Sequence, residues 1–174
     1  SIRGYADLHR MIVNISRFFL CSDGKYIDIG SSDGGLAKLV SSHTGCTDII
    51  CYEKENTFHT NENYKNFTIL SDALSIDFSG ISFITSVFTL QFIQKDKRLG
   101  ILQSVYNALE VGGGFVLAEK VVLGCELDLM FQDILLQDKR QFFTDTEILD
   151  KNLMLQNTMK CLSLQEIKKM LDFV

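Results

Sequence analysis

The sequence has no proline and no tryptophan, and only three of its 174 residues are histidines. It also has no low-complexity stretch and no internal repeat, which favours an ordinary globular architecture. Its longest apolar runs are far shorter than the roughly 20 residues that a membrane-spanning helix needs. The start of the sequence has no signal-peptide pattern. We therefore expect a protein that does not enter a membrane.

Basic residues are outnumbered, with 17 Lys and Arg against 22 Asp and Glu, for a formal net charge of −5. This balance disfavours direct nucleic-acid binding through a basic face. The cysteines form no CxxC pair, and we interpret them as reduced thiols of a cytoplasmic protein; they are Cys21, Cys46, Cys51, Cys125 and Cys161. The histidines, His9, His43 and His59, lack metal-ligand spacing. We predict no metal site and place each histidine at the surface or on a helix face.

Length and composition predict one domain over residues 1–174, because about 100–200 residues is the usual domain size. Hydrophobic residues make up 46% and charged residues 22% of the chain, as in globular proteins with a packed core. Within this domain we expect an N-terminal helical segment (1–24), a nucleotide-binding core (25–120) and a helical C-terminal segment (121–174).

Short apolar runs alternate with stretches of helical periodicity, a pattern typical of a parallel sheet covered by helices on both faces. The predicted strands are 26–29, 49–52, 67–70, 83–87 and 115–118, and three glycines at 112–114 are expected to break the chain before the last one. The predicted helices are 6–20, a segment with Leu36, Leu39 and Val40 on one face, 97–109, the region from about 125 onward, and about 163–171. The last of these opens with a capping-box pattern. We therefore predict an α/β fold.

Polar residues follow three consecutive predicted strands. A glycine after the first strand, Gly30, lets the backbone approach a ligand closely, and the carboxylate of Asp28 suits a cationic ligand group. Glu53, 23 positions after Gly30, can accept hydrogen bonds from ribose hydroxyls. Asp72 and Ala73 can meet an adenine edge after the third strand. Adenosine with a charged amino-acid tail indicates S-adenosylmethionine.

An NAD-linked reductase is the alternative ligand class for such a sheet. The turn departs from the GxGxxG fingerprint, because Ser32 occupies the second glycine position. The carboxylate of Asp28 is also a poor neighbour for a pyrophosphate. Both features favour S-adenosylmethionine over NAD.

The runs Tyr26–Ser31, Val87–Phe92 and Ala118–Lys120, with Gly4 and Tyr5 near the start, resemble class I S-adenosylmethionine-dependent methyltransferases. More narrowly, they are similar to the carboxy-S-adenosylmethionine synthase family, and the resemblance covers nearly the whole chain. It implies a Rossmann-like fold, a cytoplasmic homodimer and a role in wobble-uridine modification of tRNA.

The same resemblance implies a bound S-adenosylmethionine, S-adenosylhomocysteine or carboxy-S-adenosylmethionine. The cofactor-binding residues are then Tyr5, Asp28, Gly30, Ser31, Glu53, Asp72, Ala73, Val87 and Phe88. Tyr5 and Lys120 are the candidate catalytic residues.

In that family a carboxyl group from prephenate is placed on the methyl group of S-adenosylmethionine, and an arginine of the neighbouring subunit grips it. The matching position here is Asn152, which cannot form a charged bidentate contact. The family's asparagine before Phe88 is Val87. We therefore expect a methyltransferase-like enzyme with an unidentified acceptor; the alternatives are a carboxy-S-adenosylmethionine synthase proper and a non-catalytic binding protein. A chain without proline cannot hold the Asn/Asp-Pro-Pro-Tyr/Phe motif of typical adenine and cytosine N-methyltransferases.

The family adds a strand hairpin after its last helix, and this hairpin is missing from the sequence up to Val174. The strand 115–118 would then be an apolar sheet edge, which proteins normally cover. We expect the late helices or a second subunit to cover it.

Overall fold

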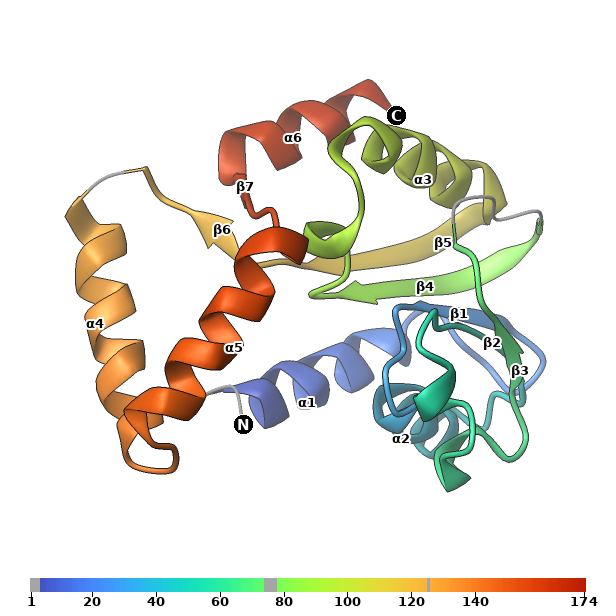
Figure 1. The fold of residues 1–174 in the computed structure, drawn as a ribbon. Helices are drawn as coiled ribbons and strands as arrows, with labels where there is room; N and C mark the ends of the chain where they lie inside the picture. Colours follow the sequence, from blue (N-terminus) through green and yellow to red (C-terminus); the bar gives the residue numbers. More distant parts are fainter. Residues whose placement is uncertain (1–3, 74–77, 125) are drawn as a thin grey trace.

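A five-stranded parallel sheet forms the centre of the computed structural model, which describes residues 4–73, 78–124 and 126–174 (Figure 1). The strands lie in the order β3-β2-β1-β4-β5, and every neighbouring pair is parallel. Their bounds are β1 Lys25–Ile29, β2 Asp48–Tyr52, β3 Thr68–Leu70, β4 Ile81–Val87 and β5 Leu109–Ala118. The predicted α/β fold is confirmed. Because the strands are parallel, all their carboxyl ends meet at one edge of the sheet.

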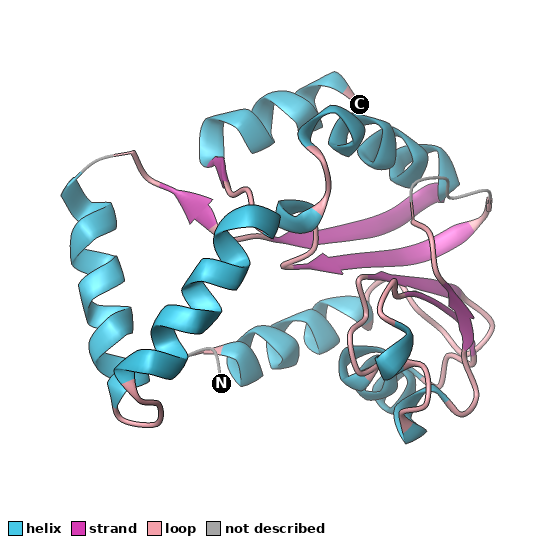
Figure 2. Cartoon of the chain, viewed as in Figure 1, coloured by secondary structure: helices cyan, strands magenta, loops and turns pink. Residues whose placement is uncertain are grey.

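Helices cover both faces of this sheet (Figure 2). Helices α1 (Tyr5–Ser16) and α2 (Gly35–Thr44) bury Ile12 and Val40 in a core with Tyr26 and Phe83 of the sheet. On the other face, α3 (Lys95–Ala108) packs with the isoleucines of β1 and β4. Helix α6 (Leu164–Phe173) lies beside α3. The sheet is therefore sandwiched between two apolar layers, which explains why its strands read as continuous apolar runs.

The C-terminal segment forms a helical hairpin that projects from the sheet (Figure 1). It consists of α4 (Glu126–Arg140) and α5 (Asp145–Thr158), and a short parallel pair, β6 (Val121–Val122) with β7 (Leu162–Ser163), lies at its base. The predicted capping box of the last helix is confirmed at Ser163 and Glu166. A second capping box, formed by Thr144 and Glu147, begins α5 and was not predicted from the sequence.

Strand β5 differs from its prediction at the three glycines. They lie inside the strand, not before it, and the pairing register with β4 shifts between Ile81 and Phe83. A positive φ of 87° at Gly112 lets the strand continue through this irregularity. In the described part of the chain β5 is the last strand of the sheet, and residues 115–118 are half-buried. The late helices therefore leave this edge partly open.

Three short 3₁₀ helices complete the described structure, at Asn56–Phe58, Glu62–Tyr64 and Leu90–Phe92. The cysteines described, Cys21, Cys46, Cys51 and Cys161, are free thiols, whereas Cys125 lies outside the described residues. Within the described ranges no helix is both long and apolar enough to cross a membrane.

Candidate functional site

The turn after β1 is held tightly against the end of β2. The backbone amides of Gly30 and Ser31 donate to the carbonyl of Tyr52, with N···O distances of 2.8 and 3.1 Å. Gly30 has a φ of 72°, and a Cβ there would collide with the side chain of Thr89. The hydroxyl of Ser31 hydrogen-bonds the hydroxyl of Tyr64 at 2.7 Å. Glycine is thus required at position 30, and the turn is rigid.

Glu53 joins this turn to the second strand. Its Oε2 accepts the amide of Ser32 at 2.7 Å and its Oε1 accepts the amide of Glu55 at 2.8 Å, and the residue is only 9% exposed. A carboxylate has about four acceptor sites, so two remain for hydroxyl donors. Glu53 therefore lies where a ribose would be bound in a sheet of this type.

Asp28 is a buried carboxyl with one unsatisfied oxygen. Its Oδ1 accepts a 2.6 Å hydrogen bond from the hydroxyl of Thr85, which also bonds the hydroxyl of Tyr26 at 2.7 Å. Its Oδ2 is shielded from solvent and has no partner among the described residues. Burial raises the pKa of Asp28 to about 7, opposed by the Thr85 bond and assisted by the charge of Glu53. A buried oxygen without a partner at the end of β1 fits a cationic ligand group.

Aromatic rings cover the ends of β1 and β4. The ring of Tyr5 on α1 stacks with that of Phe88, with centroids 6.3 Å apart. Phe88 follows β4 directly and has a φ of 55°, a conformation that is strained for a bulky residue. Burial, followed by the charges of Asp33 and Asp28, raises the pKa of the Tyr5 hydroxyl. Tyr5 therefore lies close to the acidic turn, on the face of the sheet that α1 covers.

A half-buried carboxylate fixes the loop after β4. Glu119 accepts three backbone amides, from Thr89 at 2.9 Å, Leu90 at 2.7 Å and Gln91 at 3.3 Å. Burial raises the pKa of Glu119, while these amides act in the opposite direction. The loop begins with Phe88, whose own amide donates to the carbonyl of Ala118 at 2.7 Å, so the end of β5 holds the backbone of residues 88–91. The role of Glu119 has no signal in the sequence beyond the resemblance of Ala118–Lys120, because its partners are backbone amides.

A buried cation, Arg98, donates hydrogen bonds to backbone carbonyls of the same loop. Arg98, with 0% exposure, donates to the carbonyls of Ile93 (2.8 Å), Gln91 (3.3 Å) and Lys160 (2.7 Å). The third of these bonds ties the segment before β7 to the loop. Sequence reasoning missed Arg98, because its partners are backbone atoms that carry no residue-type signal.

The structure brings together six of the predicted cofactor-binding residues. They lie at the carboxyl ends of β1, β2 and β4 or on α1 above them: Tyr5, Asp28, Gly30, Ser31, Glu53 and Phe88. Val87, half-buried, packs against the core. After β3, Asp72 is exposed and Ala73 is half-buried against the sheet.

Two predicted residues lie elsewhere. Lys120 is exposed and lines a small space with Arg98, Glu119 and Leu162, on the side of β7. Asn152 is exposed on α5. Lys120 follows the carboxyl end of β5 by two residues, but neither Lys120 nor Asn152 has a described interaction with the acidic turn after β1.

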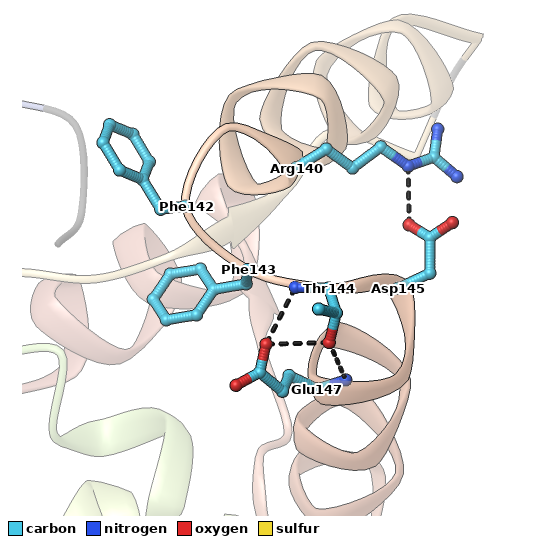
Figure 3. Close-up of a pocket in the computed structure, with 6 residues that line it drawn as sticks. All are labelled: Arg140, Phe142, Phe143, Thr144, Asp145 and Glu147. Carbon is cyan, nitrogen blue, oxygen red and sulfur yellow. Dashed lines mark hydrogen bonds and ion pairs between the residues drawn. The ribbon is translucent and has the colours of Figure 1, made fainter.

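A hollow at the tip of the α4–α5 hairpin is unrelated to the strand ends (Figure 3). Its polar side chains satisfy one another: Arg140 pairs with Asp145 at 2.8 Å, and Thr144 and Glu147 form the capping box. Phe142 contributes an exposed ring. In the described ranges no group of His, Cys, Asp and Glu residues could hold a metal ion. The acidic strand ends remain the candidate site.

Sheet order, glycine turn and strand-end acids together define a Rossmann-like domain of the class I methyltransferase type. The YcgJ protein from Bacillus subtilis has the same fold, with a TM-score of 0.67 and 15% identity over 95% of this chain and 66% of that one. So does phosphoethanolamine N-methyltransferase 2 of Haemonchus contortus, solved in complex with S-adenosyl-L-methionine, with a TM-score of 0.66 and 17% identity over 95% of this chain and 36% of that one.

A narrower relationship comes from the sequence. The carboxy-S-adenosyl-L-methionine synthase of Staphylococcus epidermidis is 30% identical over 184 aligned positions, covering 99% of this chain and 79% of that protein. No model of a known protein family matches the chain. The chain belongs to the carboxy-S-adenosyl-L-methionine synthase family and is a transferase of the class I methyltransferase type.

Proposed function

We propose that the protein binds S-adenosylmethionine at the carboxyl ends of its central strands and transfers a group at the sulfonium. The unpartnered Oδ2 of Asp28 carries this proposal, because a buried carboxylate oxygen at the end of β1 calls for a cationic partner. Glu53 would bind the ribose hydroxyls, and Asp72 and Ala73 the adenine edge. When bound, the sulfonium supplies an electrophilic methyl carbon with acidified hydrogens.

The residues of this chain bind and orient that group. Asp28, Asp33 and Glu53 make the turn region acidic, which favours a cation over a phosphate. Gly30 and Ser31 let the backbone approach, and Tyr5 with Phe88 would cover the sulfonium and exclude water. Positioning of the acceptor then contributes most of the rate, so few further catalytic side chains are expected.

Carboxy-S-adenosylmethionine synthesis from prephenate is the second candidate reaction. Membership of the synthase family favours it, and its product would serve wobble-uridine modification of tRNA. The residue aligned with the family's arginine is Asn152, whose amide gives a carboxylate no charged partner. Plain methyl transfer to an acceptor without negative charge therefore remains the leading proposal.

The α4–α5 hairpin supports a homodimer. Its apolar side chains are 40–77% exposed in the single chain: Leu127, Leu129, Met130, Phe131, Ile134, Leu135, Phe142, Phe143, Leu149, Leu153 and Met154. A monomer rarely exposes so many large apolar groups on one element. A second copy docked on this hairpin would bury them and could bring Asn152 near the partner's pocket. Free cysteines support a reducing compartment such as the cytoplasm.

The proposal is tested by mass spectrometry of the small molecule released when freshly purified protein is denatured. Recovery of S-adenosylmethionine or S-adenosylhomocysteine supports the leading proposal. Recovery of carboxy-S-adenosylmethionine selects the second reaction and shows that Asn152 suffices for the carboxylate. Binding without any turnover of added S-adenosylmethionine, across a panel of hydroxyl, amine and nucleic-acid acceptors, would instead identify a non-catalytic binding protein.

A further inference from the structure

His9 lies in a row of rings that leads to the end of β4. It follows Tyr5 by one turn of α1, and the two ring centroids are 4.1 Å apart at an interplanar angle of 50°. Tyr5 in turn stacks on Phe88, the residue directly after β4. His9 lies on a helix face, as expected, and it is half-buried on the side of α1 that carries Tyr5.

The Nε2 atom of His9 is shielded from solvent and has no hydrogen-bond partner among the described residues. Leaving such an atom unpaired is unfavourable, so it normally marks a missing partner. Asp28 also carries an unpaired buried oxygen, and its side chain lies on the same face of the sheet as Tyr26, the face that α1 covers. Two unsatisfied polar atoms thus belong to residues at the end of β1 and in the helix packed over it.

The electrostatic surroundings favour a neutral His9. Burial lowers its pKa from the ordinary value, and the charge of Asp33 acts in the opposite direction. Asp33 belongs to the turn after β1, and Tyr5 is the titratable neighbour on α1. A neutral imidazole has one nitrogen that accepts a hydrogen bond. An anionic acceptor would be repelled by Asp33, whereas an N–H or O–H donor would not.

We infer that His9 contacts the ligand at the reacting end of the S-adenosylmethionine site, where Nε2 accepts a hydrogen bond from the hydroxyl or amine of an uncharged or cationic acceptor. This inference rests on the proposed function. The inference defines the acceptor as an uncharged or cationic hydrogen-bond donor, and it gives α1 a role in selecting that acceptor.

Binding of two analogues to the wild-type protein and to His9→Phe tests the contact. S-adenosylhomocysteine lacks the transferable methyl group, whereas sinefungin has an amine at the position of that methyl group. A charge-assisted hydrogen bond contributes about 1.5–3 kcal/mol, so wild-type protein should prefer sinefungin. In His9→Phe the ratio of the two affinities should fall by about tenfold or more. His43→Phe, on the exposed surface of α2, is the matched control and should keep the wild-type ratio.

A second measurement needs no variant. NMR titration of the imidazole resonances should give His9 a lower pKa in the complex with S-adenosylmethionine than in that with S-adenosylhomocysteine, because only the first holds a positive charge at sulfur. His43 should titrate identically in both. An unchanged affinity ratio together with equal His9 titrations would overturn the inference. If neither compound binds wild-type protein, the proposed function itself fails. If His9→Phe does not fold, the NMR comparison alone decides.

Discussion

The buried carboxyl of Asp28 should make the ligand-free protein less stable as the pH rises. In the native state its pKa is about 7, against an ordinary value of 3.8, and burial is the main cause. Between these values the native state keeps a proton that the unfolded chain has released. Stability therefore falls with increasing pH through this window, and the loss is complete above pH 7.

The magnitude follows from the two pKa values. At about 1.4 kcal/mol for each pH unit, ionising Asp28 in the native state costs about 4 kcal/mol above pH 7. Asp28→Asn removes this cost while its Oδ1 still accepts the hydrogen bond of Thr85. The variant should be more stable than wild type at pH 8, and the advantage should shrink by about 2 kcal/mol on going to pH 5.5.

Urea unfolding of ligand-free protein at pH 5.5, 6.5, 7.5 and 8.5, followed by circular dichroism, measures this difference. Asp48→Asn, at an exposed position at the start of β2, is the matched control for loss of a carboxylate. The same Asp28→Asn variant should bind S-adenosylmethionine at least about tenfold more weakly, because the cationic group of the ligand loses a charged partner. If the stabilities of wild type and Asp28→Asn change in parallel with pH, the pKa of Asp28 is not raised by burial in the native state.

Three further results are expected. Gly30→Ala should destabilise the protein by about 2 kcal/mol or more in thermal unfolding, because the added Cβ would collide with Thr89 and the backbone φ is positive. Gly112→Ala should cost less, because a Cβ at that position has no atom within 4 Å. Glu119→Ala should cost about 2 kcal/mol in urea, because three amides of the loop after β4 lose their acceptor. Met154 on α5 is 75% exposed, and Met154→Lys should convert a dimer into a folded monomer in sedimentation.

Each of these has a contradicting outcome. Equal destabilisation by the two glycine variants would mean that the Thr89 contact is unimportant. A Glu119→Ala variant as stable as wild type would mean that water satisfies the three amides. Sedimentation of wild type as a monomer would remove the reason for the α5 variant and leave the hairpin's apolar surface without a partner.

The sheet could be predicted because each strand is a short apolar run buried on both faces. The parallel order then placed the residues after β1 and β2 at one edge, so Gly30 and Glu53 were predictable neighbours. Helix α4 shows the limit of the same reasoning. Its apolar stripe is present, but none of its residues is buried in the single chain. Periodicity identifies an apolar face without identifying what covers it.

The candidate site was predictable where side chains meet a ligand and unpredictable where they meet backbone. Glu119 and Arg98 fix the loop after β4 entirely through amides and carbonyls, which every residue type carries. Helix periodicity puts His9 beside Tyr5, but only the packing of α1 brings this pair to Phe88 at the end of β4. The three glycines in β5 resembled a chain break, because a bulge inside a strand has the same composition as a turn.

Equilibrium binding of S-adenosylmethionine to the purified wild-type protein and to Glu53→Ala, measured by isothermal titration calorimetry with NADH as the comparison ligand, tests the central claim most directly. We predict one-to-one binding of S-adenosylmethionine to wild type, at least about tenfold weaker binding to Glu53→Ala, and no binding of NADH. Tight binding of NADH, or S-adenosylmethionine affinity that is unchanged in Glu53→Ala, would contradict the account.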